Sequence, residues 1–253
     1  MLPYFGVTYI PLGPLNIQVW GLLVSLGIGA AILVSYYQAR KKGLDEKKII
    51  DLAFWVILPA LIGGRVFYIL TELDKYQDNF WDVFKIWEGG MTVSGGFIGA
   101  VIGGVVYLKV KKMDLWKYAD VGVFGLPLGL FIGRLGCFFV FDHPGKPTSF
   151  FLGQEFVDGV IRHNHGLYLS LNGLILFIIF LILNRKNHKA PFYSIIFLIY
   201  YGVVRFFLDF WRAWDGPFTD ARFYNLTAAQ WFALGMVVLG VILLFYRKRI
   251  VDK

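Results

Sequence analysis

The sequence contains little cysteine and little charge. One of its 253 residues is cysteine and 17% are charged, whereas 57% are hydrophobic. The single Cys137 excludes an intrachain disulfide, and so apolar a composition excludes an ordinary soluble domain. No basic residue precedes Arg40, so we expect no cleaved signal peptide. The sequence also lacks a P-loop, a dinucleotide fingerprint and a GxSxG nucleophile elbow.

Long apolar runs are abundant instead. Seven of them are long enough to cross a hydrocarbon core about 30 Å thick. They cover residues 17–38, 50–71, 90–108, 119–141, 166–184, 191–211 and 227–246. We therefore predict an all-α integral membrane protein with seven transmembrane helices. Residues 1–253 would form one transmembrane catalytic domain, with residues 142–165 as an extracytoplasmic loop insert.

The basic residues predict the orientation of these helices. Sixteen Lys and Arg residues lie in the connections at 40–48, 109–117 and 185–189 and in the C-terminal segment 247–253, and six lie in the opposite connections. The positive-inside rule then places the N-terminus outside and the C-terminus in the cytoplasm. The net charge of +8 comes from basic residues that cluster between the apolar runs and orient the protein, so it does not indicate a nucleic-acid partner.

Three arginines lie inside apolar runs, where a guanidinium group is costly. They are Arg65, Arg134 and Arg205, each six or seven residues before the predicted outer end of its span. A rise of 1.5 Å per residue puts all three roughly 9–11 Å below the outer boundary. One reading is a shared pocket for an anion, for which a lipid phosphate is the abundant candidate at that depth. The alternative is that each arginine separately extends its head group to the interface.

A polar stripe follows the sixth run. Tyr201, Arg205, Asp209 and Arg212 fall within about 80° of arc on a helix that is otherwise apolar. Asp209 is one turn from Arg205 and could orient it, and a planar guanidinium suits a phosphate. The alternative is a satisfied ion pair between helices.

Two further groups of residues could carry chemistry. Asp142 and His143 precede Pro144 at a tight turn, where His143 could act as a general base oriented by Asp142. A solvated polar loop explains the same pattern. Cys137 lies one turn beyond Arg134, as a nucleophile in a positive field or as a packing residue.

A second histidine-rich stretch, residues 162–165, precedes the fifth run. His163 and His165 are two residues apart, and the spacing suggests no third ligand. We therefore predict no metal and no cofactor.

Five motifs in register carry a family resemblance. They are GGRVFY, GGMTVSGGFIGAVIGG, GRLGCF, RHNHGLY and YGVVRFFLDFWR. In this order they resemble prolipoprotein diacylglyceryl transferase, and the resemblance spans nearly the whole chain. It implies a seven-span enzyme of the bacterial inner membrane. Such an enzyme moves the diacylglyceryl group of phosphatidylglycerol to the lipobox cysteine of a prolipoprotein signal peptide. The products are a thioether and glycerol phosphate.

The resemblance also implies roles for individual residues. Arg134 matches the arginine of the family signature, Arg205 matches an essential late arginine, and Asp142 falls at an acidic signature position. The other matched positions of the site are Arg65, His163, Tyr168, Tyr201, Asp209 (often Glu in the family) and Arg212.

Several positions depart from the family pattern. Ser94 replaces the histidine proposed as the family's base, and Cys137 replaces a signature asparagine. Gly166 and Leu169 replace a glutamine and a glutamate, and Trp20 replaces a usual tyrosine. We count Ser94 and Cys137 among the substrate-binding residues, and we predict that His143 takes over as the base.

Three other functions remain open at this point. The altered residues are compatible with a transferase that uses another acceptor, or with a lipid-binding scaffold that has no activity. An anion transporter or channel is disfavoured because no carboxylate lies in the middle of a span.

Overall fold

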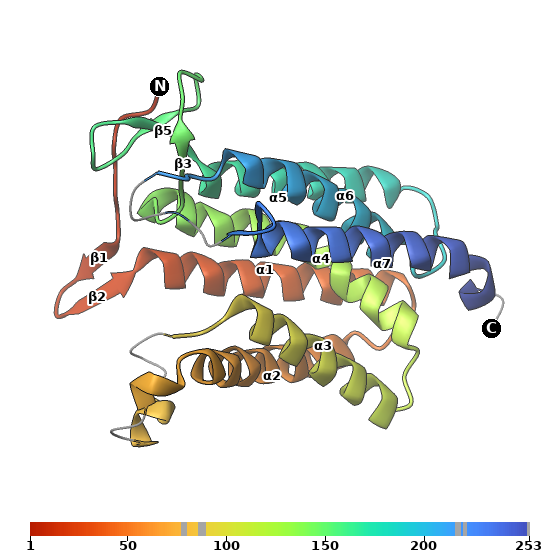
Figure 1. Ribbon diagram of the computed structural model, residues 1–253. Coiled ribbons are helices and arrows are strands. Elements are labelled where there is room, and N and C mark those ends of the chain that lie inside the picture. Colours follow the sequence, from red (N-terminus) through yellow and green to blue (C-terminus); the bar gives the residue numbers. More distant parts are fainter. Residues whose placement is uncertain (77–79, 86–89, 216–218, 220–221, 252–253) are drawn as a thin grey trace. The chain divides into compact units, whose positions relative to one another are not determined.

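The computed structural model describes residues 1–253 except 77–79, 86–89, 216–218, 220–221 and 252–253. It is mostly helical (Figure 1). The α-helices are α1 (Val19–Lys41), α2 (Lys47–Thr71), α3 (Val93–Val110), α4 (Leu115–Val140), α5 (His165–Leu183), α6 (Phe192–Leu208) and α7 (Ala228–Val251). Short 3-10 turns are η1 (Leu73–Tyr76), η2 (Phe80–Phe84) and η4 (Asp209–Trp211).

Six helices of the described chain, all but α3, are long and apolar enough to cross a membrane. The prediction of a helical membrane protein is therefore confirmed. α3 is an apolar helix of 18 residues at the position of the third predicted span. A seventh crossing and the orientation of the termini stay predictions.

The chain divides into two compact units, which we describe separately. Unit 1 comprises residues 1–38 and 119–253, and unit 2 comprises residues 39–118. Unit 2 is built on the pair of helices α2 and α3. Their backbones approach closely because glycines face each other: a Cβ on Gly95 would lie 2.3 Å from the carbonyl oxygen of Gly63. Small residues allow such contacts between membrane helices.

This close approach gives a stability prediction. Gly95→Ala should destabilise the folded protein by about 1–3 kcal/mol, the usual range for overpacking, because the new methyl group meets backbone that cannot rotate away. Gly96→Ala is the matched control, because its Cβ would lie no nearer than 3.5 Å to Ala60 O. Thermal unfolding in detergent measures both variants. Equal midpoints for the two variants would contradict the predicted packing.

The core of unit 1 lies between α4, α5 and α6. Phe124, Leu176, Phe180 and Tyr193 are each at most 2% exposed and form one cluster. Phe124 and Phe180 stack at 5.5 Å, and Tyr193 meets the Phe124 ring edge-on at 4.9 Å. This aromatic packing holds the three helices that carry most of the site residues described below.

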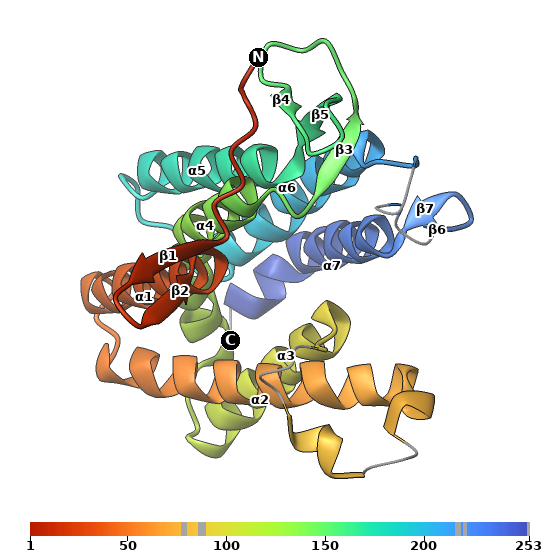
Figure 2. The ribbon, with the colours of Figure 1, turned by 90° about the vertical axis from the view of Figure 1, so that its left-hand side faces the viewer.

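Residues 142–165, predicted as a loop insert, form a small antiparallel sheet in unit 1. Its strands are β3 (Pro144–Pro147), β4 (Gln154–Glu155) and β5 (Ile161–Asn164), in the order β3-β5-β4 (Figure 2). The other strands form two hairpins, β1 (Tyr9–Leu12) with β2 (Leu15–Gln18) and β6 (Arg222–Phe223) with β7 (Leu226–Thr227). β5 leads directly into α5.

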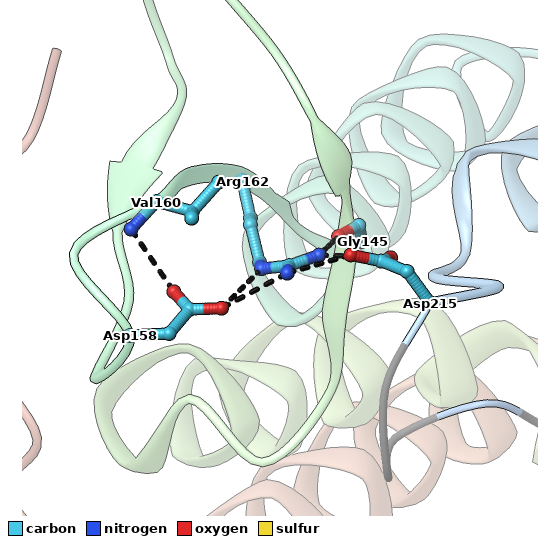
Figure 3. Close-up of polar contacts among 5 residues, drawn as sticks. All are labelled: Gly145, Asp158, Val160, Arg162 and Asp215. Carbon is cyan, nitrogen blue, oxygen red and sulfur yellow. Dashed lines mark hydrogen bonds and ion pairs between the residues drawn. The ribbon is translucent and has the colours of Figure 1, made fainter.

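Arg162 on β5 ties the sheet to the segment after η4 (Figure 3). Its guanidinium donates to both carboxylate oxygens of Asp215, at 3.0 and 2.7 Å, and to Asp158 at 2.9 and 3.1 Å. It also donates to the carbonyl of Gly145 on β3 at 3.3 Å. These bonds fix the start of α5 relative to the chain that follows α6.

Candidate functional site

The C-terminal end of α4 brings four of the predicted site residues together. Phe141 adopts a positive φ of 54° immediately after the helix and reverses the chain. Asp142 and His143 therefore fold back over Cys137. The Cys137 sulfur, a carboxylate oxygen of Asp142 and a ring nitrogen of His143 lie within 4.8 Å of one another. Arg134, one turn earlier, donates from Nη1 to Cys137 Sγ at 3.8 Å.

The Cys137, Asp142 and His143 side chains form a connected set. The His143 ring contacts the Asp142 carboxylate through Nδ1 and also hydrogen-bonds the Cys137 thiol. Cys137 is 4% exposed, whereas about a third of each of the other two side chains is exposed. The Cys137 sulfur is therefore buried, whereas the His143 imidazole is partly exposed to solvent. We call this set of three residues the Cys137 cluster.

α6 and η4 supply the second part of the site. Arg205 Nη1 lies 2.9 Å from Asp209 Oδ1, and the Arg205 and Asp209 side chains are 13% and 1% exposed. Asp209 also accepts a hydrogen bond from the hydroxyl of Thr227. Arg205 is close enough to Arg134, Tyr201 and Arg212 for their charges to interact. The polar stripe predicted on α6 therefore lies near Arg134 of α4.

The contact between Arg205 and Asp209 is close but is not aligned as a hydrogen bond. Arg205 Nη1 and Asp209 Oδ1 are both buried, and neither has a hydrogen-bond partner among the described residues. The guanidinium of Arg205 is therefore incompletely satisfied at Nη1.

The start of α5 packs against the end of α4. Asn164 caps α5 by accepting from Leu167 N at 3.2 Å and donates to Phe138 O at 3.3 Å. Gly166 permits the contact, because a Cβ there would lie 2.4 Å from Phe138 N. Glycine at this position, where the family pattern has glutamine, thus has a packing reason.

His165 is a site residue that the sequence analysis did not assign. It is fully buried, and neither ring nitrogen has a hydrogen-bond partner among the described residues. Arg205, Arg212, His143 and His163 are all within electrostatic range of it. A buried polar group without a partner is costly, so such a group indicates a ligand or a functional role. The paired histidines of RHNHGLY were the only sequence signal for it.

His163 and Tyr168 lie in a separate cavity between β5, α5 and α6. Nδ1 of His163 and the Tyr168 hydroxyl are 2.7 Å apart, and Trp211 stacks on the His163 ring at 5.5 Å. The cavity has a volume of about 620 Å³ and also contacts Asn172 and Tyr200. Most of its lining is apolar, so it is suited to a hydrocarbon chain beside a few polar groups.

Arg65 and Ser94 belong to unit 2. The Arg65 guanidinium donates to the backbone carbonyls of Asp82, Val83, Lys85 and Gly90, at 2.9–3.2 Å. It therefore holds η2, Lys85 and Gly90, which lie between α2 and α3. Ser94 is exposed in the first turn of α3.

His143 and His163, which both precede α5, have opposite electrostatic surroundings. The hydrogen bond to Asp142, followed by that to Cys137, raises the pKa of His143 from 6.5 to about 9. Burial, with a smaller effect of Lys146, lowers the pKa of His163. At neutral pH, His143 is therefore an imidazolium and His163 is neutral.

The raised pKa of His143 predicts a pH effect on stability. Since the folded protein favours the protonated ring, this contribution is fully present below about pH 6.5 and is lost as the pH rises through about 9. The thermal midpoint of His143→Gln should therefore fall less between pH 7 and 10 than that of the unmodified protein. Parallel midpoint curves over this range would contradict the assigned ion pair.

Comparison with known proteins identifies the family of this chain. The family model for prolipoprotein diacylglyceryl transferase matches residues 7–246. A protein of Listeria welshimeri, named phosphatidylglycerol–prolipoprotein diacylglyceryl transferase, is 30% identical over 251 residues, covering 94% of this chain and 88% of its own. Proteins of the same name from Oceanobacillus iheyensis and Bacillus velezensis are also 30% identical, over 96% and 94% of this chain and 88% and 90% of theirs. The chain belongs to the prolipoprotein diacylglyceryl transferase family.

Proposed function

We propose that this protein transfers the diacylglyceryl group of phosphatidylglycerol to the lipobox cysteine of a prolipoprotein signal peptide. The observation that carries the site assignment is the pair of guanidinium groups on α4 and α6. Arg134 and Arg205 are within electrostatic range of each other, and Arg205 keeps an unaligned donor. Asp209 balances only one of these two cations inside the apolar bundle, and a phospholipid phosphate would supply a second anion.

The topology proposed here is that of a multi-pass protein of the bacterial inner membrane. α3 would be the seventh crossing, with the N-terminus outside and the C-terminus in the cytoplasm. Arg134 and Arg205 then lie roughly 9–11 Å below the outer boundary. Phosphatidylglycerol in the outer leaflet would enter sideways with its phosphate at this depth. Residues 1–253 act as one catalytic domain in this proposal.

Arg134 and Arg205 would hold the phosphate and stabilise the charge that develops as glycerol phosphate leaves. The acceptor thiolate attacks the C3 carbon of the diacylglyceryl group. A carbon–sulfur bond forms, the carbon–oxygen bond to the phosphate breaks, and its electron pair stays on the phosphate oxygen. Tyr201, Asp209 and Arg212 orient the arginine on α6. Both reactants are anchored in the membrane, so proximity contributes further to the rate.

Arg65 has a different role in this proposal. Its guanidinium already has four carbonyl acceptors in unit 2. We propose that it secures η2 and Gly90 beside α2. The cavity beside His163 and Tyr168 would take an apolar part of a substrate.

A transfer assay tests the proposed function. Purified protein in phosphatidylglycerol vesicles with a labelled diacylglyceryl group receives a lipobox peptide, and the product is a peptide that gains this label through a base-stable thioether. The control is the same peptide with serine in place of its cysteine. Label on both peptides would indicate another acceptor. Label on neither, with intact folded protein, would contradict the transferase assignment and favour a lipid-binding scaffold.

A further inference from the structure

The Cys137 cluster combines residue types that the proposed reaction has not yet used. Cys137 is the only cysteine of the chain and lies between two cationic groups, Arg134 and His143. Asp142 contacts the imidazole at Nδ1. Cations beside a thiol favour its thiolate form. A carboxylate that contacts the imidazole fixes the orientation of the ring.

The reaction needs a proton acceptor for the lipobox thiol, and His143 alone is poorly suited to be one. Its ring is engaged by Asp142 and Cys137 and is protonated at neutral pH, so no nitrogen lone pair is free. Ser94, at the family's proposed base position, is a hydroxyl and not a base at this pH. The group in the cluster that can accept a proton is therefore the sulfur.

This reasoning rests on the proposed function and extends it. We infer that Cys137 is held as a thiolate by Arg134 and His143, and that this thiolate is the proton acceptor for the incoming lipobox thiol. Asp142 is a positioning residue, since it acts through His143. Arg134 contacts Cys137 at 3.8 Å, so a phosphate held by Arg134 brings the C3 carbon of the lipid close to the same sulfur.

The proton balance closes within the site. The proton of the lipobox S–H passes to the Cys137 sulfur, and the resulting lipobox thiolate attacks C3. Because the cluster favours the thiolate of Cys137, proton transfer from an ordinary lipobox thiol is uphill, and the attack on C3 consumes the small amount of lipobox thiolate that forms. Cys137 then loses its proton to solvent or to the leaving phosphate. About a third of the His143 side chain is exposed, which gives the proton a route outward.

Alkylation of the purified protein tests the ionisation independently of transfer. Since the chain has one cysteine, a small thiol reagent such as methyl methanethiosulfonate reports on Cys137 alone. An ordinary thiol reacts about tenfold more slowly for each pH unit below about 8. The inference predicts a nearly constant rate between pH 6.5 and 8 in detergent. It also predicts that His143→Gln lowers the rate at pH 7 at least about tenfold.

The charged groups around the sulfur define the control variants. They are Arg134 on α4 and Asp142 and His143 after it, with His165 on α5 within range of His143. Asp142→Asn should lower the alkylation rate less than His143→Gln does. If the unmodified protein and His143→Gln share the steep pH profile of an ordinary thiol, the inference is wrong. This result would leave the proposed function intact if labelled transfer still occurs.

Transfer by Cys137 variants gives the second readout. Cys137→Ser and Cys137→Asn should both fold, and Asn is the residue of the family pattern. Both should lower kcat about 10²–10⁴-fold at pH 7, the usual contribution of a general base, with KM for phosphatidylglycerol nearly unchanged. A rate near that of the unmodified protein in either variant would overturn the inference.

Two other results would reassign the cluster. A diacylglyceryl adduct on Cys137 after incubation with phosphatidylglycerol alone would make the sulfur a nucleophile. One equivalent of zinc in the purified protein, with alkylation released only by a chelator, would make the three residues metal ligands. Either result would overturn the proton-acceptor role.

Discussion

Arg134→Ala and Arg205→Ala should each lower diacylglyceryl transfer about 10²–10³-fold, which corresponds to roughly 2.7–4 kcal/mol of lost charge stabilisation. Each change removes a guanidinium that would hold the phosphate and bear the charge of the leaving group. Lysine at either position keeps the charge but not the planar pair of donors, so it should recover only part of the rate. The measurement is kcat with labelled phosphatidylglycerol and a lipobox peptide.

The control for these variants is Arg185→Ala. Arg185 is an exposed arginine just beyond the far end of α5, and its loss should change transfer less than twofold. Circular dichroism and gel filtration would show that all variants remain folded. Full activity in both Arg134→Ala and Arg205→Ala would contradict the phosphate site.

Asp209→Ala should destabilise the protein by about 3–5 kcal/mol, because it leaves the charge of Arg205 without its buried partner. Asp209 is 1% exposed, lies 2.9 Å from Arg205 and also accepts from Thr227. Asp209→Glu, the residue that the resemblance often has here, should retain much of both stability and transfer. The loss of stability and of transfer should therefore occur only when the carboxylate at this position is removed.

Thermal unfolding in detergent measures the Asp209 series against Lys117→Ala. Lys117 pairs with Asp114 at 3.2 Å, and its side chain is 62% exposed. An exposed pair of this kind contributes at most about 1 kcal/mol, and the variant keeps the backbone hydrogen bond from residue 117 to Asp114. If Asp209→Ala and Lys117→Ala lower the midpoint equally, Asp209 is not the partner that stabilises a buried cation.

Hydropathy predicted the helices well, because a bilayer forces each crossing segment to satisfy its backbone internally. The run predicted at 50–71 is α2 (Lys47–Thr71), and the run at 191–211 corresponds to α6 (Phe192–Leu208) followed by η4. Counting residues along these spans puts Arg65, Arg134 and Arg205 at one depth, which stays a prediction. In unit 1, Arg134 and Arg205 are close enough for their charges to interact.

Local spacing could not reveal the Cys137 cluster or the burial of His165. The cluster depends on Phe141 adopting a positive φ, which a non-glycine residue seldom does. The burial of His165 accompanies the close packing of Gly166 on the backbone of Phe138, a contact between segments 28 residues apart. The sequence does not distinguish Arg65 from the other two arginines. Its hydrogen-bond acceptors are backbone carbonyls 17–25 residues away, and backbone groups leave no sequence pattern.

A structure of the protein with bound phosphatidylglycerol tests the central claim most directly. The predicted result is a phosphate with oxygens within about 3 Å of the guanidinium nitrogens of both Arg134 and Arg205, the distance of a charge-assisted hydrogen bond. The Arg205–Asp209 contact should persist in that complex. A phosphate bound elsewhere, with both arginines directed only to protein partners, would contradict the account.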